Sequence, residues 1–312
     1  MEMLINTLFP VFGIILLGYV ASKLHLLSPS ESAILNKFVY FIAFPSLLFV
    51  VMATAPMEKI FYWEFLGAWG LGLGITFLLT TVVSLYIWRD PLPTLSINSL
   101  NTTCSSTAFM GVPLLLVAFG QDAALAAIVA TTFLVAIVIS LSIFLIELKQ
   151  VDNSVLLILK KIIVSLSHNP LMIGAVLGIL VSASVQLPES VSSLFDLLGK
   201  AAIPISLFSI GLFIAGQSVE QIKEGLFKVH VLTFIKLFLH PAITWILIEL
   251  FFDLNAEWTA ITVLLAGLPP ATTCFVLAQR YEVGVSTTAS MTVISTIYSL
   301  FTISVLLLLF SS

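Results

Sequence analysis

Residues 101–113 read Asn-Thr-Thr-Cys-Ser-Ser-Thr-Ala-Phe-Met-Gly-Val-Pro and interrupt one long apolar segment, and residues 268–274 read Leu-Pro-Pro-Ala-Thr-Thr-Cys and interrupt another. Proline removes a backbone donor and clashes with the preceding turn, so we expect both segments to unwind partway. Unwound backbone at membrane depth is tolerated only where it is buried in protein or lines a watery cavity. Two matching broken helices, one in each half of a chain, are typical of a secondary transporter that binds its substrate near the bilayer midplane.

The composition indicates a membrane protein. Hydrophobic residues make up 60% of the chain, charged residues only 9%, and the mean hydropathy is +1.17, whereas about a quarter of a soluble domain is charged. The net charge of −4, without a basic run, gives no indication of a nucleic-acid partner. The amino terminus lacks a positive n-region and a cleavage site, so we expect the first apolar segment to remain as a span.

A membrane span needs about 20 largely apolar residues, and the chain has about ten such segments. They run near 4–22, 32–54, 63–88, 95–118, 122–147, 168–186, 191–217, 229–252, 256–279 and 285–310. The most polar connection follows the fifth segment, and within it residues 155–163 have the pattern of a short helix in the membrane interface. The sequence therefore predicts an all-α polytopic membrane protein with ten transmembrane helices.

The two halves of the chain correspond. Thr102-Thr103-Cys104 recurs 170 positions later as Thr272-Thr273-Cys274, and the run from Pro45 to Phe49 has a counterpart from Pro204 to Phe208. A unit with an odd number of spans must insert its second copy upside down, which is the plan of many carriers. We therefore predict a five-helix repeat at 1–147, a cytoplasmic connection at 148–167 and an inverted second repeat at 168–312.

The distribution of Lys and Arg predicts the orientation. Even-numbered connections hold only Lys59 and Lys200, and Lys236 falls within a span. Odd-numbered connections hold the other nine: Lys23, Lys37, Arg89, Lys149, Lys160, Lys161, Lys223, Lys228 and Arg280. This bias predicts a multi-pass protein of the cell's inner or plasma membrane, with cytoplasmic odd connections and both termini outside.

The broken fourth and ninth spans carry the strongest functional signal. At a helix break, the freed amides of the new amino-terminal end direct positive partial charge into the gap, which suits carboxylates and phosphates. We predict that substrate is bound by the residues of the two breaks, namely Asn101, Thr102, Thr103, Ser105, Ser106, Thr107, Gly111, Pro113, Pro269, Pro270, Thr272, Thr273 and Cys274. The alternative is that these hydroxyls bond only to their own helices or allow close helix packing.

Lys236 and His240 are four residues apart in the eighth span, so they share a helix face. Ionisable residues within spans are candidates for function. Lysine would balance the charge of an anionic substrate, and histidine would relay a proton near neutral pH. The alternative is that Lys236 snorkels toward the interface and His240 bonds a carbonyl beside Pro241.

Signatures of catalysis are absent from the sequence. No phosphate-binding loop, nucleophile elbow, HExxH pair or Cys-His metal cluster occurs. We therefore predict that the chain is not an enzyme, and we expect neither a cofactor nor a bound metal.

The chain resembles the auxin efflux carrier family, which includes plant PIN proteins and many bacterial carriers. The resemblance lies in Phe109-Met110-Gly111-Val112-Pro113-Leu114-Leu115, in Leu268-Pro269 followed by residues 275–281, and in Asn36-Lys37 leading to residues 44–49. It implies ten spans in two inverted repeats, crossed broken helices 4 and 9 with substrate beside the crossing, and a scaffold of spans 1, 2, 6 and 7 that includes Pro45, Ser46 and Pro204. The short middle connection is similar to the bacterial branch.

Two residues depart from the family's pattern. Ser106 stands where members commonly have an asparagine, and Cys274 stands where the plant branch often has a proline. These departures bear on auxin-like specificity and leave the transport role unchanged.

The sequence thus favours a carrier that moves a small organic anion, such as a carboxylate, by alternating access, with efflux as the expected direction. Three alternatives stay open: a sodium-coupled importer of the bile-acid symporter type, a channel, and a ligand-sensing membrane protein. Candidate partners besides the anion and the lipid bilayer are H⁺ or Na⁺ as coupling ion, and a second copy in a homodimer.

Overall fold

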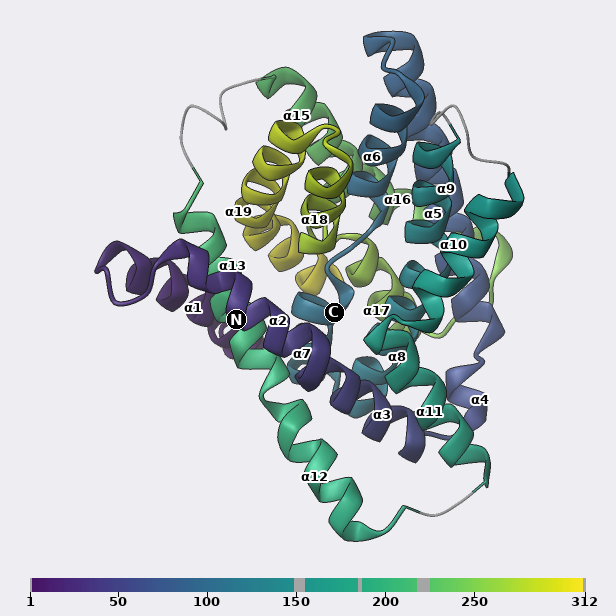
Figure 1. The fold of residues 1–312 in the computed structure, drawn as a ribbon. Coiled ribbons are helices and arrows are strands. Elements are labelled where there is room, and N and C mark those ends of the chain that lie inside the picture. The colour runs from purple at the N-terminus through teal and green to yellow at the C-terminus, as the bar shows by residue number, and fades with distance from the viewer. Residues whose placement is uncertain (1, 149–154, 185–186, 218–224, 311–312) are drawn as a thin grey trace. The chain divides into compact units, whose positions relative to one another are not determined.

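The computed structural model describes residues 2–148, 155–184, 187–217 and 225–310. Within these ranges the regular structure is helical, apart from one isolated β-bridge (Figure 1). Lys149 and Lys223, which contribute to the predicted orientation, lie outside the described residues, as do residues 1, 311 and 312.

The α-helices are α1 (Glu2–Lys23), α2 (Ser32–Phe38), α3 (Phe44–Thr54), α4 (Met57–Ile60), α5 (Trp63–Val83), α6 (Leu92–Thr103), α7 (Val112–Phe119), α8 (Gln121–Phe133), α9 (Ser140–Glu147), α10 (Val155–Ser167), α11 (Pro170–Ser184), α12 (Glu189–Lys200), α13 (Ala202–Ala215), α15 (Leu226–Phe234), α16 (His240–Phe251), α17 (Ala256–Ala266), α18 (Thr272–Tyr281) and α19 (Val285–Phe310). One 3₁₀ turn, η1 (Pro29–Glu31), and five π-helical turns, η2 (Val39–Ala43), η3 (Ser84–Trp88), η4 (Thr107–Gly111), η5 (Leu134–Ile139) and η6 (Ile235–Leu239), complete the helical structure.

Six helical runs in the described ranges are long and apolar enough to cross a membrane: Pro29–Thr54, Met57–Trp88, Gln121–Glu147, Glu189–Ala215, Leu226–Phe251 and Val285–Phe310. A seventh results if the bent pair Leu156–Ser167 and Pro170–Ala183 is one span. The predicted first, fourth and ninth spans contain only shorter apolar helices, Leu8–Lys23, Thr107–Phe119 and Ala256–Ala266. The chain is therefore an all-helical membrane protein whose described ranges contain six candidate spans, or seven if the bent pair is counted as one.

The contacts divide the chain into two compact units. Unit 1 comprises Met1–Tyr62, Thr107–Thr132 and Ser167–Gln217, and unit 2 comprises Trp63–Ser106, Phe133–Leu166 and Ser218–Ser312. Unit 1 contains the predicted spans 1, 2, 6 and 7, which the family resemblance assigns to a scaffold. It also contains residues 107–132, so the boundary falls inside the broken fourth segment.

Unit 1 is built on close contacts between helix backbones. A Cβ atom on Gly18 of α1 would overlap the carbonyl of Phe208 in α13, and one on Gly211 would overlap the carbonyl of Ile15. A Cβ on Gly174 of α11 would lie 2.5 Å from the carbonyl oxygen of Pro45 in α3. Small residues allow such approach in membranes, where association relies on van der Waals packing.

One proline of unit 1 lies in a helix where we expected it to end one. We expected Pro113 to unwind the fourth segment, but it occupies the first turn of α7, behind η4. Proline is tolerated there because its missing N–H is not needed by the first turn. It leaves the carbonyl of Phe109, four residues earlier, without its usual helix donor. The hydroxyl of Ser206 lies 3.3 Å from that oxygen and shares its hydrogen with the carbonyl of Ile203 in its own helix, at 2.9 Å.

The interior of unit 2 is polar by comparison. Buried hydroxyl and amide side chains line α6 and α19, and two small apolar clusters lie among them, Ala68 with Ile248 and Val263, and Val229 with Leu232 and Met291. Among the described residues, the eight buried side-chain atoms without a hydrogen-bond partner all belong to this unit: Trp69 Nε1, Thr76 Oγ1, Asn98 Oδ1, Asn101 Oδ1, Ser142 Oγ, Thr233 Oγ1, His240 Nε2 and Thr302 Oγ1.

Candidate functional site

The two predicted breaks are present, and they lie against each other within unit 2. The helix α6 ends at Thr103, and α17 and α18 are separated by residues 267–271. Ser105 and Pro270 form an antiparallel β-bridge. Its hydrogen bonds run from the amide of Ser106 to the carbonyl of Pro269 at 2.8 Å, and from the amide of Ala271 to the carbonyl of Cys104 at 2.9 Å.

This bridge changes the expected role of the unwound backbone. We expected freed amides on both breaks to hold an anion, but the amides of Ser106 and Ala271 are already used by the opposite break. Pro269 and Pro270 have no amide hydrogen to offer. The amides left for a ligand are therefore those of the first turn of α18, at Thr272 and Thr273, because first-turn N–H groups have no partner within their own helix.

Lys236 lies at this junction and is fully buried, with an exposed fraction of 0%. The π-helical turn η6 places its Nζ 2.5 Å from Ser105 Oγ, 3.0 Å from the carbonyl oxygen of Ala266 and 3.1 Å from His240 Nδ1. None of the three is an anionic group, and none of the four ion pairs in the described ranges includes Lys236. The snorkelling alternative is therefore wrong for this lysine.

His240 has one engaged and one unengaged ring nitrogen. Its Nδ1 contacts Lys236, whereas its Nε2 is buried without a partner in the described part of the chain. The indole ring of Trp69 in α5 lies 6.0 Å from the imidazole between ring centroids, and its Nε1 also lacks a partner. Sequence reasoning missed Trp69, although the glycines around it, Gly67, Gly70 and Gly72, indicate close packing at that turn of α5.

Several predicted site hydroxyls are engaged within the protein. Thr103 donates to the carbonyl of Ser99 in its own helix at 2.6 Å, as the alternative interpretation expected. Thr102 lies 3.0 Å from the same carbonyl and also pairs with Thr80 of α5 at 2.7 Å. Thr107 pairs with Thr131 at 2.8 Å.

The other predicted site residues differ in their hydrogen bonds and in their burial. Asn101 donates to Thr288 Oγ1 at 2.8 Å and keeps its Oδ1 without a partner in the described ranges. Thr272 and Thr273 are half-buried, whereas Ser106, Gly111, Pro113, Pro269, Pro270 and Cys274 are buried.

The predicted scaffold residues lie in unit 1. Ser46 donates to the carbonyl of Ile42 at 2.7 Å, within its own helical run. Pro45 contacts α11 through Gly174, and Pro204 is on an exposed face of α13.

Comparison with known proteins places this arrangement in a family. The family model described as membrane transport protein matches residues 3–307. The chain belongs to this family of transporters. This confirms the resemblance to auxin efflux carriers that the motifs of the fourth and ninth segments indicated.

Three relatives of this transporter match over nearly its whole length. It is 26% identical to the "Putative malonate transporter" of Rhizobium meliloti over 97% of this chain and 94% of the relative. It is 26% identical to the "Uncharacterized transporter YfdV" of Escherichia coli over 93% of this chain and 92% of that protein. The "Uncharacterized transporter MJ1031" of Methanocaldococcus jannaschii is also 26% identical, over 94% of each chain.

The far end of α18 is anchored by a polar cluster. The hydroxyl of Tyr281 donates to Glu147 Oε1 at 3.0 Å, and Lys161 of the amphipathic helix α10 pairs with Glu147 Oε2 at 3.0 Å. Because α18 also provides the first-turn amides at its other end, this cluster fixes the position of a helix that belongs to the candidate site of the transporter.

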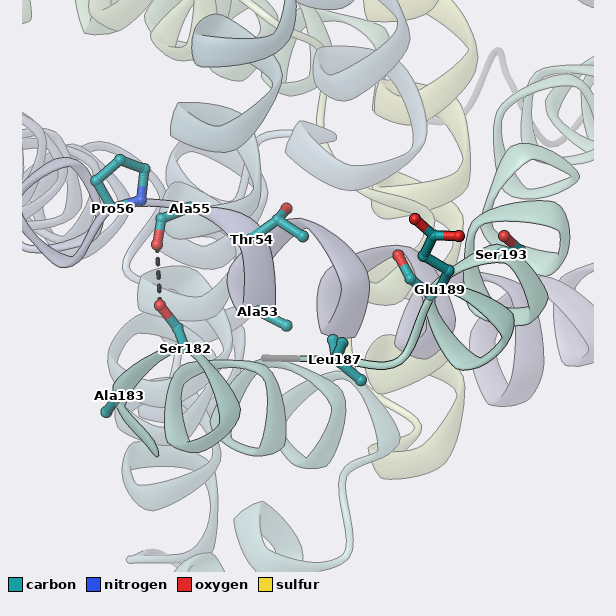
Figure 2. Close-up of a pocket in the computed structure, with 10 residues that line it drawn as sticks. Ala53, Thr54, Ala55, Pro56, Ser182, Ala183, Leu187, Glu189 and Ser193 are labelled. Atoms are coloured by element: carbon teal, nitrogen blue, oxygen red, sulfur yellow. Dashed lines mark hydrogen bonds between the residues drawn. The ribbon is translucent and has the colours of Figure 1, made fainter. Parts of the chain in front are cut away.

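A cavity of about 940 Å³ opens in unit 1. Figure 2 shows it beside the hydrogen bond from Ser182 to the carbonyl of Ala55, with Thr54 and Glu189 among its lining residues. No lysine or arginine lines it, and the carboxylate of Glu189 would repel an organic anion. We therefore assign the candidate site by charge and burial, to unit 2.

Proposed function

We propose that this transporter is a carrier of a small organic anion of the carboxylate class, and that the anion pairs with Lys236 beside the two breaks. The observation that carries the proposal is a fully buried lysine whose three contacts are all neutral. Burial of an uncompensated ammonium is costly in a protein interior and in a membrane. A carboxylate brought to this position gains a partner and relieves that cost.

The contacts of Lys236 suggest how an anion enters the site. The carbonyl of Ala266 is fixed by the end of α17, whereas the hydroxyl of Ser105 can rotate. We propose that Ser105 releases Lys236 and donates a hydrogen bond to one oxygen of the bound carboxylate. The first-turn amides of Thr272 and Thr273 would donate hydrogen bonds to the second oxygen, since negative charge is favoured at a helix amino terminus.

A carboxylate is the substrate class that the relatives support best. One relative is named as a malonate transporter, and a dicarboxylate of that size offers the charge and the oxygens that Lys236 and the amides of α18 would bind. Malonate is therefore the first probe, while the identity of the natural substrate is a question for a wider screen of carboxylates.

We propose alternating access as the transport mechanism. The chain would cross the cell membrane ten times, as inverted repeats at 1–147 and 168–312 with both termini outside, and the residues 148–167 would connect them in the cytoplasm. Unit 1 would act as the scaffold and unit 2 would carry the site. For a bare anion, an inside-negative potential favours exit by about 2.3 kcal/mol per charge per 100 mV, which supports efflux.

Counterflow of radiolabelled malonate into vesicles that contain the purified protein and unlabelled malonate tests the proposal. The wild type should accumulate label transiently, which a channel or a non-transporting sensor cannot do. Lys236→Met should abolish the signal, because it keeps the side-chain volume and removes the charge. Lys59→Met is the matched control, because Lys59 forms an exposed ion pair with Asp122 in unit 1. Equal counterflow in wild type and Lys236→Met would contradict the assigned site.

A further inference from the structure

We propose that Lys236 and His240 together bind one transported proton, so that one negative charge of the anion crosses the membrane together with a compensating proton. This inference rests on the proposed function and adds the coupling ion to it. The geometry that supports it is the 3.1 Å contact between Lys236 Nζ and His240 Nδ1, which joins two titratable groups inside a fully buried site.

The contacts of Lys236 satisfy its protonated and its neutral form equally well. As an ammonium, Nζ donates three hydrogen bonds, to Ser105 Oγ, to the carbonyl of Ala266 and to His240 Nδ1. As an amine, it donates to the first two and accepts from the Nδ1–H of His240. The two forms differ by one proton and by the tautomer of the imidazole, and neither requires a side chain to move.

The surroundings supply no fixed counter-charge. The thiols of Cys104 and Cys274 are close enough to Lys236 to interact with it electrostatically. No aspartate or glutamate occurs in α6, α18 or α19, and those of the neighbouring helices α5, α16 and α17, namely Glu64, Glu249 and Glu257, are at exposed positions. The one tyrosine of α19, Tyr298, is exposed and contacts His230. A proton on this pair is therefore compensated only when an anion is bound.

His240 Nε2 is the atom at which the proton would arrive. It is buried and has no partner in the described part of the chain. A proton that binds Nε2 makes the imidazole cationic, and the Nδ1 proton then passes to Nζ across the 3.1 Å contact. The N–H bond at Nδ1 breaks, a new N–H bond forms at Nζ, and the histidine is neutral again.

This coupling determines how transport depends on the membrane potential and on the gradients of the anion and of protons. The loaded site holds an ammonium and one carboxylate charge, so its net charge is zero, and the empty site returns with a neutral lysine. Transport of a monoanion then becomes insensitive to the membrane potential. Net efflux follows when the outward anion gradient exceeds the inward proton gradient.

Proton uptake during malonate binding to the detergent-purified protein tests the inference, with a pH dye in weak buffer and calorimetry on the same sample. We expect about one proton to be taken up per malonate bound, and the affinity to weaken about tenfold per pH unit in the alkaline range. Malonate binding without proton uptake overturns the coupling and leaves the proposed carrier function in place. Absence of malonate binding overturns both.

Two variants locate the proton. Lys236→Arg keeps a permanent cation, since guanidinium is not deprotonated in proteins, so it should bind malonate without proton uptake and with an affinity independent of pH. His240→Gln retains an acceptor for Lys236 and should slow proton uptake while keeping one proton per anion. One proton per anion in Lys236→Arg would show that the proton binds elsewhere and would overturn the inference.

Discussion

The two units of this transporter are both helical, but their interiors differ in packing and polarity. In unit 1, α1 and α13 approach so closely that Gly18 and Gly211 leave no room for a Cβ atom. In unit 2, helices end inside the unit, and its described interior contains a buried lysine and eight polar atoms without partners. Close apolar packing favours a single arrangement, whereas unsatisfied polar groups keep a site ready for a ligand.

This difference predicts that substitutions in the two units affect different properties. Substitutions in unit 1 should change stability and leave affinity alone, and substitutions at the site of unit 2 should do the reverse. Four substitutions test this separation, from the largest expected effect to the smallest.

Gly211→Leu should produce the largest change, a loss of about 3 kcal/mol or more in the free energy of unfolding. The new side chain would overlap the carbonyl of Ile15, and overpacking at a backbone contact cannot be relieved by a rotamer change. Thermal unfolding in detergent measures the loss. Gly13→Leu is the control, since no atom lies within 4 Å of a Cβ placed there. A stable Gly211→Leu variant would mean that the α1–α13 contact is not rigid.

Lys236→Met should leave the folded protein as stable as the wild type, or more stable by about 1–4 kcal/mol, because an apolar side chain of similar volume replaces a buried charge. The same variant should lose malonate counterflow. Melting curves without malonate, recorded beside those of Lys59→Met, provide the comparison. A large loss of stability would show that Lys236 is a structural residue.

Ser206→Ala should cost about 1–3 kcal/mol of stability, because the Phe109 carbonyl that Pro113 leaves open would be buried without a donor. The affinity for malonate should not change. Ser304→Ala is the control, since that exposed hydroxyl bonds only to its own helix, at Leu300. A change in affinity would indicate that unit 1 contributes to binding directly.

Thr273→Val should have the smallest effect, at most about a fivefold loss of affinity for malonate, because it keeps the backbone amide that we propose binds the anion and removes only the hydroxyl, a hydrogen-bonding group worth about 1 kcal/mol. Stability should stay the same because Thr273 is half-buried. Thr54→Val changes a residue that lines the cavity of unit 1, and it tests whether malonate binds there instead. Titration calorimetry would contradict our assignment if Thr54→Val weakened binding and Thr273→Val did not.

Much of the fold follows from local sequence. The apolar segments and both interruptions were predictable because a span has a minimum length, and because proline and clustered hydroxyl residues disfavour continuous helix. The position of the first break was less accurate, since Pro113 lies inside the helical turn that follows. The division of the fourth segment between the units was not predictable, because residues 107–132 join unit 1 through contacts distant in sequence.

The site was predictable in part. The spacing of Lys236 and His240 indicated a shared helix face, but a lysine in a span either snorkels or turns inward, and only tertiary contacts decide between these. The partners that decided it were the hydroxyl of Ser105 and the carbonyl of Ala266, 131 and 30 residues away in sequence. The freed amides of the breaks were assigned to a ligand as a group. The bridge that uses the amides of Ser106 and Ala271 has no local signal in the sequence.

The most direct test of the account is a distance measurement by solid-state NMR between the side-chain nitrogen of lysine, labelled with ¹⁵N, and ¹³C-labelled malonate. We predict dipolar coupling typical of a hydrogen-bonded ammonium and carboxylate, with N···O about 2.7–2.9 Å. The coupling should persist in Lys228→Arg and vanish in Lys236→Arg, which should still bind malonate. Coupling that survives in Lys236→Arg, or is absent from the saturated wild type, would contradict the account.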